Sequence, residues 1–407
     1  MYGLIGKKLG HSFSPQIHKR LADYEYKLFE MEENEVGDFM KNADFNGINV
    51  TIPYKKTVIP YIDRLSDDAK KIGSVNTVKR MPDNTLYGDN TDYYGFKYTL
   101  DNNKISPCGK KCIILGSGGA SLTAISVLRD MCAKEITVIS RTGENNYGNI
   151  SKHFDAEIIV NTTPVGMYPN CGQAPISLAD FTKCEFVFDL IYNPAKTALL
   201  LEAEKLGIPY SNGLTMLTAQ AKKSSEIFTG NKIDESKIRE ITESLQKQTL
   251  NIVLVGMPGC GKSTLGKILA DKLNRRFLDT DSVIEQKFGA SIPEIFAQKG
   301  EDFFRELEES AVSECGCLSS CVIATGGGVI LRQKNIDALR QNGIIIFLDR
   351  NIDELASDGR PLSQNPEKIK ALYQKRFPIY KECADFEVKV NTAPDLLAEQ
   401  IIQKLSI

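Results

Sequence analysis

The sequence predicts an α/β protein of several domains with largely parallel sheets. Short β-branched runs alternate with helix-like segments, as in KCIILGSGG at residues 111–119 and NIVLVGMPG at residues 251–259. Both of these strands run directly into glycine-rich turns, at Gly116 and Gly256, and each turn opens a helical segment. A length of 407 residues fits two or three domains. We therefore expect two nucleotide sites in one chain.

Composition and charge narrow the class of protein. The chain is 42% hydrophobic and 25% charged, which is ordinary for a globular protein. The formal net charge of -2 offers no basic surface for nucleic acid. No run approaches the roughly 20 apolar residues of a membrane span, and the N-terminus lacks a signal-peptide pattern. We expect a soluble, cytoplasmic protein that binds small molecules, and we leave its oligomeric state open.

A charged segment at residues 231–249 separates the two glycine turns from each other. It contains no Pro or Gly, and Ile233, Ile238, Ile241 and Leu245 follow approximately one helical face. This pattern predicts a helical linker without chemistry of its own. The ten cysteines lack the paired spacing of a zinc site, so we expect reduced thiols.

The C-terminal glycine turn carries a phosphate-binding signature. Gly256, Gly261, Lys262 and Ser263 satisfy GxxxxGK(S/T) after the strand at 251–255 and before a helix that is expected to run from Thr264 to about Leu273. Glycines let backbone amides turn towards phosphate oxygens at a helix N-terminus. Lys262 is expected at the β and γ phosphates and Ser263 on Mg²⁺. The residues predicted to hold ATP are Gly259, Cys260, Gly261, Lys262, Ser263 and Thr264.

The motifs that follow this loop sharpen the prediction. They are FLDTDSVIE at 277–285, SIPEIFAQKGEDFFRELE at 291–308, ATGGGV at 324–329, GRPL at 359–362 and YQKRFPIY at 373–380. In this order they closely resemble shikimate kinase, and the resemblance covers nearly all of residues 250–400. It implies a P-loop kinase domain with a parallel sheet, which transfers the terminal phosphoryl group of ATP to shikimate.

The resemblance also implies roles for single residues. Asp279 would organise the magnesium ion and its waters, and Asp281 would hold the ring hydroxyls and take the proton from the attacking one. Arg305 and Arg376 would grip the substrate carboxylate through charge-assisted hydrogen bonds. The further contacts it implies are those of Gly326, Gly327 and Gly328 with the ring and of Arg360 with the phosphates. Taken singly, such an Asp can cap a helix and such an Arg can lie on the surface.

One stretch of the kinase-like part departs from the family. Residues 348–360 are shorter than the usual approach to the lid, and they lack its additional arginine before Arg360. That arginine helps to cover the adenine, so the departure bears on nucleotide affinity or lid closure.

The N-terminal glycine turn reads GSGGAS at residues 116–121 and predicts a Rossmann-like domain. The next strand ends in Ser140, Arg141 and Thr142 where an acidic residue would favour NAD, so Arg141 argues for the 2′-phosphate of NADP. An ordinary surface arginine is the alternative. The residues predicted to contact NADP are Gly116, Gly118, Gly119, Ala120, Ser140, Arg141, Thr142, Tyr192, Gly213 and Met216.

Further motifs lie on both sides of this turn. They are HSFSP at 11–15, GINVTIPYKK at 47–56, GSVNTV at 73–78, GDNTD at 88–92, NTTPVGM at 161–167, DLIYNP at 189–194 and TAQA at 218–221. Together they resemble shikimate dehydrogenase over residues 1 to about 230. The resemblance implies that Ser12 and Ser14 face the substrate carboxylate. It places around the ring hydroxyls Thr51, Asn76, Asp92 and Gln220.

The same resemblance makes Lys55 and Asp92 the catalytic pair. A lysine beside an aspartate stays protonated because the opposite charge favours its charged form, and a protonated amine can donate to a ketone oxygen. Lys56 would point to the opposite face if the segment is extended. Tyr192 and Met216 would line the nicotinamide end, or would only form part of the cleft wall.

Two departures concern the nucleotide domain. Ser140 stands where the family often has Asn, and residues 141–161 are too short for the helix and strand that usually fill this stretch. We expect weaker binding of the adenosine end.

The predicted organisation has four parts. A substrate-binding domain covers 1–103, and a helix at about 214–230 returns to it. A Rossmann-like NADP domain covers 104–213, the linker 231–249 and the P-loop kinase domain 250–407. The sequence thus predicts a bifunctional enzyme, with two alternatives: a regulatory or binding protein with disabled catalysis, or a quinate-type dehydrogenase joined to a kinase for another small acceptor.

Overall fold

The computed structural model of this chain describes residues 1–10, 12–355 and 366–407. By its internal contacts the chain divides into two compact units. The first unit comprises Met1–Pro164, Pro175–Tyr192 and Glu202–Ser244, and the second comprises Val165–Ala174, Asn193–Leu201 and Leu245–Ile407. No helix in the described ranges has the length and apolar character needed to cross a lipid bilayer.

The first unit begins with a six-stranded mixed sheet. Its order is β2-β1-β3-β5-β6-β4, and only β5 runs antiparallel to its neighbours. The strands are β1 (Tyr2–Gly6), β2 (Tyr26–Glu30), β3 (Gly47–Val50), β4 (Arg64–Leu65), β5 (Thr77–Arg80) and β6 (Leu86–Asp89). The helices of this segment are α1 (Ser14–Leu21), α2 (Glu33–Asn42), η1 (Ile59–Tyr61), α3 (Asp67–Ile72) and α4 (Thr91–Asn102).

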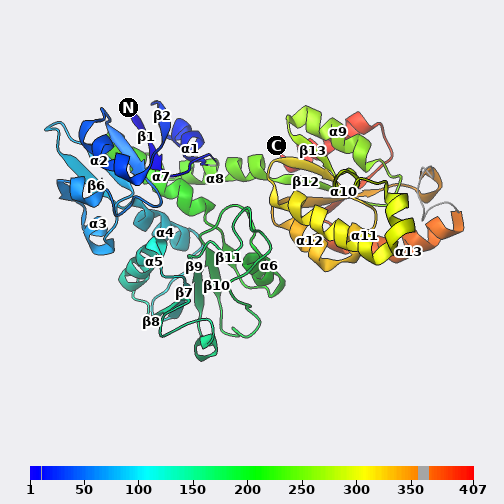
Figure 1. Cartoon of the computed structure of the whole chain (residues 1–407), viewed down its shortest axis with the longest axis horizontal. Coiled ribbons are helices and arrows are strands. Elements are labelled where there is room, and N and C mark those ends of the chain that lie inside the picture. The colour runs from blue at the N-terminus through cyan, green and yellow to red at the C-terminus, as the bar shows by residue number, and fades with distance from the viewer. Residues whose placement is uncertain (11, 356–365) are drawn as a thin grey trace. The chain divides into compact units, whose positions relative to one another are not determined.

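A helix from much later in the chain, α7 (Leu214–Thr229), returns to this first segment. It packs against α1, α4 and β5, and Figure 1 shows it, in green, beside the blue N-terminal elements. A Cβ on Gly95 of α4 would lie 2.6 Å from the carbonyl oxygen of Met216 in α7. Glycine at this position therefore lets the two helices approach each other closely.

The second sheet of the first unit is five-stranded and entirely parallel, with the order β11-β10-β9-β7-β8. Its strands are β7 (Lys111–Leu115), β8 (Glu135–Ile139), β9 (Ile158–Asn161), β10 (Phe186–Asp189) and β11 (Tyr210–Ser211). The intervening helices along the chain are α5 (Gly119–Asp130), η2 (Ile150–His153) and α6 (Ala198–Lys205). Successive strands leave β7 in opposite directions, and such a switch point is where open parallel sheets bind nucleotides.

The expectation that residues 141–161 are too short for a helix and a strand is wrong for the strand. The fully buried strand β9 occupies the end of this stretch, while the helix is reduced to the single turn η2. The strand persists because Ile158 and Val160 belong to the core between β7 and β10. The loop before η2 is held by its own hydrogen bonds, including Asn149 Nδ2 to Glu144 O at 2.8 Å.

The predicted helical linker is α8 (Ser236–Thr249), preceded by five residues that are not helical. Ile238, Ile241 and Leu245 are buried along one face, as their spacing predicts, whereas Ile233 lies before the helix. The boundary between the two units falls inside α8, after Ser244. Most residues on the other faces of α8 are exposed, so the helix is half-buried.

The second unit contains a five-stranded parallel sheet with the order β13-β14-β12-β15-β16. Its strands are β12 (Asn251–Val255), β13 (Arg276–Asp279), β14 (Cys321–Ala324), β15 (Gly343–Asp349) and β16 (Phe386–Lys389). The helices of the second unit are α9 (Lys262–Leu273), α10 (Thr280–Phe288), α11 (Ile292–Cys317), η3 (Val329–Leu331), α12 (Gln333–Arg340), η4 (Ile352–Glu354), α13 (Pro366–Cys383) and α14 (Pro394–Leu405).

Alternate residues of β12 pack into two different core clusters. Val253 and Val255 pack in the cluster that includes residues of α11 and α12, and Ile252 and Leu254 pack in the cluster that includes residues of α9 and α14. Figure 1 shows α9 on one side of the strands and α11 and α12 on the other. A central strand buried on both faces reads as a continuous apolar run, as NIVLV does.

Candidate active sites

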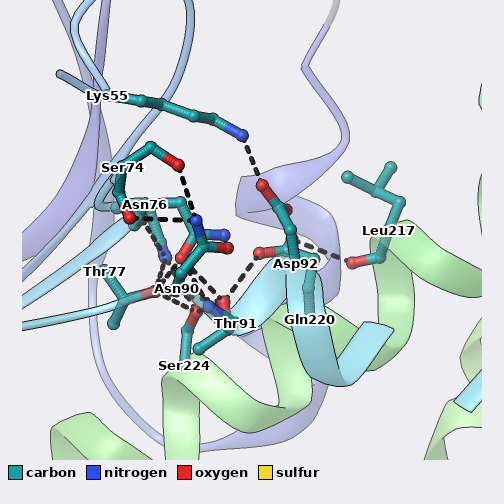
Figure 2. Close-up of polar contacts among 11 residues, drawn as sticks. Lys55, Ser74, Asn76, Thr77, Asn90, Thr91, Asp92, Leu217, Gln220 and Ser224 are labelled. Atoms are coloured by element: carbon teal, nitrogen blue, oxygen red, sulfur yellow. Dashed lines mark hydrogen bonds and ion pairs between the residues drawn. The ribbon is translucent and has the colours of Figure 1, made fainter. Parts of the chain in front are cut away.

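Lys55 and Asp92 form an ion pair in the first unit. The Lys55 Nζ to Asp92 Oδ2 distance is 2.5 Å, and the side chains are 28% and 16% exposed. Lys55 comes from the turn after β3 and Asp92 from the first turn of α4, so two separate elements meet here (Figure 2). The pair holds a cation next to an acceptor at a partly open position, an arrangement suited to moving a proton.

The segment that carries Lys55 is not extended, contrary to our expectation. β3 ends at Val50, and the chain then turns, with Val58 N donating to Tyr54 O at 3.1 Å. Buried Tyr54 and Val58 anchor this turn in the core. Lys55 reaches Asp92 while Lys56 is exposed, so the helical turn rather than strand alternation separates the two lysines.

Asn76 and Gln220 lie close to this pair (Figure 2). The buried Oδ1 of Asn76 accepts a hydrogen bond from the backbone amide of Thr91 at 2.7 Å. The Thr91 hydroxyl donates to Gln220 Oε1 at 3.3 Å, and Gln220 Nε2 donates to Leu217 O at 2.9 Å. The close packing of α4 on α7 therefore brings two predicted substrate-binding amides beside Asp92.

The predicted carboxylate end of the substrate site lies at the start of α1. Ser14 is the first residue of that helix, and its backbone amide donates to Ser12 Oγ at 3.2 Å. Thr51 follows β3, and its amide donates to Ile5 O of β1 at 3.0 Å. The ring of Tyr192 lies 5.7 Å, centroid to centroid, from that of Phe13, which stands between the two serines. His11 lies outside the described residues.

The glycine turn at Gly116 has room for a ligand. Gly116 has a φ of 99°, and Gly118 caps the N-terminus of α5 at the carboxyl end of β7. A Cβ on Gly118 or Gly119 would meet nothing within 4 Å among the residues described. An open helix N-terminus at a sheet switch point fits a dinucleotide pyrophosphate. The residues that follow β8 at the same sheet edge are Ser140, Arg141 and Thr142, and the latter two are exposed.

Close backbone packing requires glycine at position 213, which the sequence did not reveal. It caps the N-terminus of α7, and a Cβ there would lie 2.0 Å from the backbone oxygen of Leu190. Met216 lies in the first turn of the same helix, half-buried. Only glycine lets the start of α7 pass so close to the end of β10.

In the second unit, the phosphate-binding loop joins β12 to α9. Gly256, Gly259 and Gly261 have φ values of 152°, 82° and 98°, which a side chain would oppose. The buried Lys262 side chain curls over the loop, and its Nζ donates to Gly256 O at 2.9 Å and to Met257 O at 3.0 Å. The Lys262 side chain therefore folds back on the loop and holds it through these two hydrogen bonds.

Ser263 and Asp279 lie side by side at the foot of this loop. Ser263 Oγ donates to Asp279 Oδ2 at 2.6 Å, and Asp279 caps α10 by accepting from the amide of Asp281 at 3.1 Å. Mg²⁺ prefers oxygen ligands and is usually held by one or two protein groups together with phosphates and waters. Within the described ranges no cluster of three or more His, Cys, Asp or Glu competes for a metal. This pair fits a phosphate-bound magnesium ion.

A cavity of about 470 Å³ gathers the predicted kinase residues. Its lining combines the phosphate-binding loop, the start of α10, the middle of α11, the segment after β14 and α13. The predicted residues in its wall are Gly259, Gly261, Lys262, Ser263, Thr264, Asp279, Asp281, Arg305, Gly326, Gly327, Gly328 and Arg376. Phosphate-binding and anion-binding groups therefore face one space.

Two buried arginines define one end of this cavity. Arg305 is 6% exposed, and Nη1 donates to Glu308 Oε2 at 2.8 Å; Arg376 is 4% exposed, and Nη1 donates to Gly327 O at 2.9 Å. A Cβ on Gly328 would lie 2.3 Å from Arg305 Nη1, so a larger residue at this position would displace the guanidinium from its present place. Burial lowers the pKa of Arg376, which means that its charge is poorly solvated. An anionic ligand would compensate that charge.

Comparison with protein families gives two matches. A model of the shikimate dehydrogenase substrate binding domain matches residues 4–78, and a model of shikimate kinase matches residues 258–406. A shikimate dehydrogenase (NADP(+)) from Clostridium perfringens strain 13 is 38% identical over 267 residues, and the match covers 60% of this chain and 98% of the relative. The chain belongs to the shikimate dehydrogenase family. Its C-terminal part is a shikimate kinase domain.

Solved structures agree for the dehydrogenase part. A chorismate mutase/shikimate 5-dehydrogenase fusion protein from Clostridium acetobutylicum is 38% identical, with a TM-score of 0.57. The match covers 60% of this chain and 97% of that protein's chain. Shikimate dehydrogenase 1 from Peptoclostridium difficile is also 38% identical, with a TM-score of 0.55 and the same coverages. The two-sheet arrangement of the first unit is thus the dehydrogenase fold.

Among the residues that line the kinase cavity, our sequence analysis missed the buried carboxylate of Glu308. Glu308 lines the cavity, is 1% exposed, and has one carboxylate oxygen on Arg305 and one, Oε1, without a partner in the described part of the chain. Burial raises the pKa of Glu308. Its spacing of three residues from Arg305 on one helix was the available signal.

Arg360, which is expected to reach the phosphates, lies outside the described residues.

A second cavity of the kinase domain, of about 660 Å³, lies beyond the carboxyl ends of β15 and β16. Its lining is Asp349, Arg350, Asn351, Glu354, Lys389, Val390, Asn391, Thr392 and Pro394. A Cβ on Gly256 would lie 2.7 Å from Leu348 O, so β15 ends next to the phosphate-binding loop.

Proposed function

We propose that this chain is a bifunctional enzyme. It reduces 3-dehydroshikimate to shikimate with NADPH, and it phosphorylates shikimate with ATP to give shikimate 3-phosphate. The observation that carries the proposal is the second-unit cavity, in which a phosphate-binding loop, Asp281 and two buried arginines converge. The dehydrogenase family of the first unit supplies the other half. The product of one reaction is the substrate of the next.

The dehydrogenase reaction needs a proton and a hydride on the same carbonyl group. Bound NADPH supplies the hydride to the carbonyl carbon. The Lys55 ammonium donates its proton to the oxygen as the C=O bond becomes C–OH, and the Asp92 carboxylate at 2.5 Å holds Lys55 in place. We assign the carboxylate to Ser12 and Ser14, and the ring hydroxyls to Thr51, Asn76, Asp92 and Gln220. Arg141 would bind the 2′-phosphate of NADP.

The kinase reaction depends on positioning and charge neutralisation. Arg305 and Arg376 would anchor the substrate carboxylate, while Asp281 accepts the proton of the attacking hydroxyl. Lys262 would leave the loop carbonyls for the β and γ phosphates, and Ser263 and Asp279 would hold Mg²⁺. We place the adenine in the second cavity of the kinase domain, which continues the loop along the carboxyl edge of the sheet.

The proposed division of labour follows the predicted domains. Residues 1–103 with the helix at about 214–230 bind the substrate of the dehydrogenase, and 104–213 bind NADP. Residues 231–249 link these to the kinase domain at 250–407. The alternative of a binding protein with disabled catalysis gains no support, because Lys55, Asp92, Lys262, Ser263 and Asp279 are all present and in contact with groups that suit catalysis.

A single reaction mixture tests both activities. Purified protein is supplied with 3-dehydroshikimate, NADPH and Mg-ATP, and the products are followed by mass spectrometry. We expect shikimate 3-phosphate and consumption of both cofactors. Free shikimate that accumulates without phosphorylated product would refute the kinase assignment. Quinate supplied beside shikimate separates the quinate-type alternative, because a quinate enzyme would oxidise quinate at least as fast.

A further inference from the structure

A cluster of three buried hydroxyl groups lies behind Asn76, away from Lys55 (Figure 2). Thr77 belongs to β5, Thr91 begins α4 and Ser224 lies on α7. Ser224 Oγ is 2.8 Å from Thr77 Oγ1 and 3.0 Å from Thr91 Oγ1, and the two threonine oxygens are 3.1 Å apart. All three residues are at most 2% exposed, so water does not compete for these hydrogen bonds. We call them the hydroxyl cluster.

The hydrogen bonds of the hydroxyl cluster can be assigned so that every hydroxyl proton has an acceptor, with Asn76 Oδ1, 3.1 Å from Thr91 Oγ1, as an alternative acceptor for the Thr91 proton. Asn49 Nδ2 donates to Ser224 Oγ at 2.8 Å, which leaves the Ser224 proton for a threonine oxygen. The Thr77 hydroxyl then donates to Asn76 Oδ1 at 3.1 Å and the Thr91 hydroxyl to Gln220 Oε1 at 3.3 Å. Each hydroxyl has one proton to give, and this assignment places every one on an acceptor.

The backbone of Thr91 determines which way the Asn76 amide faces, and hydroxyls of the cluster donate to the same oxygen. The backbone amide of Thr91, 2.7 Å from Asn76 Oδ1, can only donate, so a carbonyl oxygen must face it. Nδ2 then points away from the cluster, and none of the described residues accepts a hydrogen bond from it. A free N–H donor beside the Lys55–Asp92 pair is placed to meet a substrate hydroxyl.

We propose that Ser224 is a positioning residue, which fixes the substrate-binding amide of Asn76 through Thr77 and Thr91. This inference rests on the proposed dehydrogenase function. Without the Ser224 hydroxyl, the buried Asn49 amide loses the nearest of its three acceptors and both threonines lose a partner, so the threonine hydroxyls are free to turn. The Asn76 amide then loses part of its preorganisation, and binding of substrate weakens while the Lys55–Asp92 pair is untouched.

The neighbouring residue Ser225 provides a matched control. It lies on the same helix and is equally buried, but its hydroxyl accepts from Tyr24 Oη at 3.0 Å and does not contact the hydroxyl cluster. We expect Ser224→Ala to raise KM for 3-dehydroshikimate about tenfold, equivalent to about 1.4 kcal/mol, without changing KM for NADPH. Ser225→Ala should leave both KM values unchanged. Thr77→Val, which keeps the side-chain volume, should act like Ser224→Ala and serves if α7 does not tolerate that alanine.

A double-mutant cycle distinguishes positioning from general destabilisation. Asn76→Ala removes the amide through which Ser224 is proposed to act, so adding Ser224→Ala should raise KM no further. Additive effects, an unchanged KM in Ser224→Ala, or an equal rise in Ser225→Ala would overturn the inference. A failure of the proposed function looks different, because the wild-type chain would then not reduce 3-dehydroshikimate at all.

Discussion

The two buried arginines of the kinase cavity, Arg305 and Arg376, form a site suited to an anion. Arg305 is paired with Glu308, whereas Arg376 has the carbonyl of Gly327, and its Nε has no partner in the described ranges. Breaking a buried ion pair costs several kcal/mol, so Glu308 keeps Arg305 stable in the absence of substrate. Glu308 lies near enough to interact with Arg376 electrostatically, but no ion pair joins Arg376 to any of the described carboxylates, and a substrate carboxylate would supply one.

His18 on α1 differs from these arginines, because its buried side chain is kept neutral instead of charged. Its ring is fully buried, stacked on Tyr26 at 4.0 Å between centroids, and its Nδ1 lies 2.6 Å from Tyr24 Oη. Burial lowers the pKa of His18 to about 3. Because the unfolded chain binds this proton near pH 6.5, stability is lost as the pH falls from about 6.5 towards 3.

We predict that this histidine destabilises the first unit in mild acid. Between pH 7 and pH 5, His18 alone should remove about 2 kcal/mol from the free energy of unfolding. In His18→Gln that contribution is absent, so the loss over the same interval should be smaller by that amount. Urea unfolding followed by circular dichroism measures this, on the transition that NADPH shifts. Parallel pH dependence in the two proteins would contradict the prediction.

Packing of α4 on α7 determines the geometry of the dehydrogenase site at the scale of elements. Asp92 lies on one helix and Gln220 on the other, and Gly95 is the point where their backbones approach. An alanine in a helix interior is normally favourable by roughly 0.5–1 kcal/mol relative to glycine. Here its Cβ would lie 2.6 Å from the carbonyl oxygen of Met216, and overpacking of this kind costs about 1–3 kcal/mol. The steric cost is the larger of the two effects.

Gly95→Ala should therefore separate α4 from α7 and impair the dehydrogenase. We expect kcat/KM for 3-dehydroshikimate to fall at least about tenfold, because a shift of about 1 Å at Asp92 suffices for a large loss of rate. Lys97→Ala on the exposed face of α4 is the control and should keep full activity. Both variants are assayed by NADPH oxidation. Wild-type kinetics in Gly95→Ala would show that the helix contact tolerates a methyl group.

At the scale of the whole molecule, the two units have separate cores and separate sites. Every residue of the dehydrogenase ion pair and hydroxyl cluster belongs to the first unit, and every residue that lines the kinase cavity belongs to the second. Residues without shared partners contribute additively to stability and function. Each activity should therefore survive the loss of the other.

We predict that Lys55→Ala abolishes NADPH oxidation with 3-dehydroshikimate and leaves ATP-dependent phosphorylation of added shikimate intact. Lys262→Ala should have the reverse effect, because Lys262 lies in the phosphate-binding loop of the second unit. The two assays are run on the same preparations, with circular dichroism as the check on folding. Loss of both activities in a folded single variant would refute independent sites.

The sequence by itself determined the fold class, and it predicted many of the residues that line the kinase cavity. Glycine turns after apolar strands predict phosphate-binding backbone conformations, because few other residues adopt the required φ values. The arginines and carboxylates of the kinase motifs are recognisable in order along the chain. These signals are local, because the residue types within a short motif determine its backbone conformation.

Only the tertiary structure decided how distant segments complete the sites. The contacts of Ser224 and the steric need for Gly213 depend on elements far apart in the sequence, which no local pattern encodes. The conformation around Lys55 was also decided this way, because burial of Tyr54 and Val58 in the core turns a segment that reads as extended. Close packing fixes those side chains, and packing is a property of the folded chain.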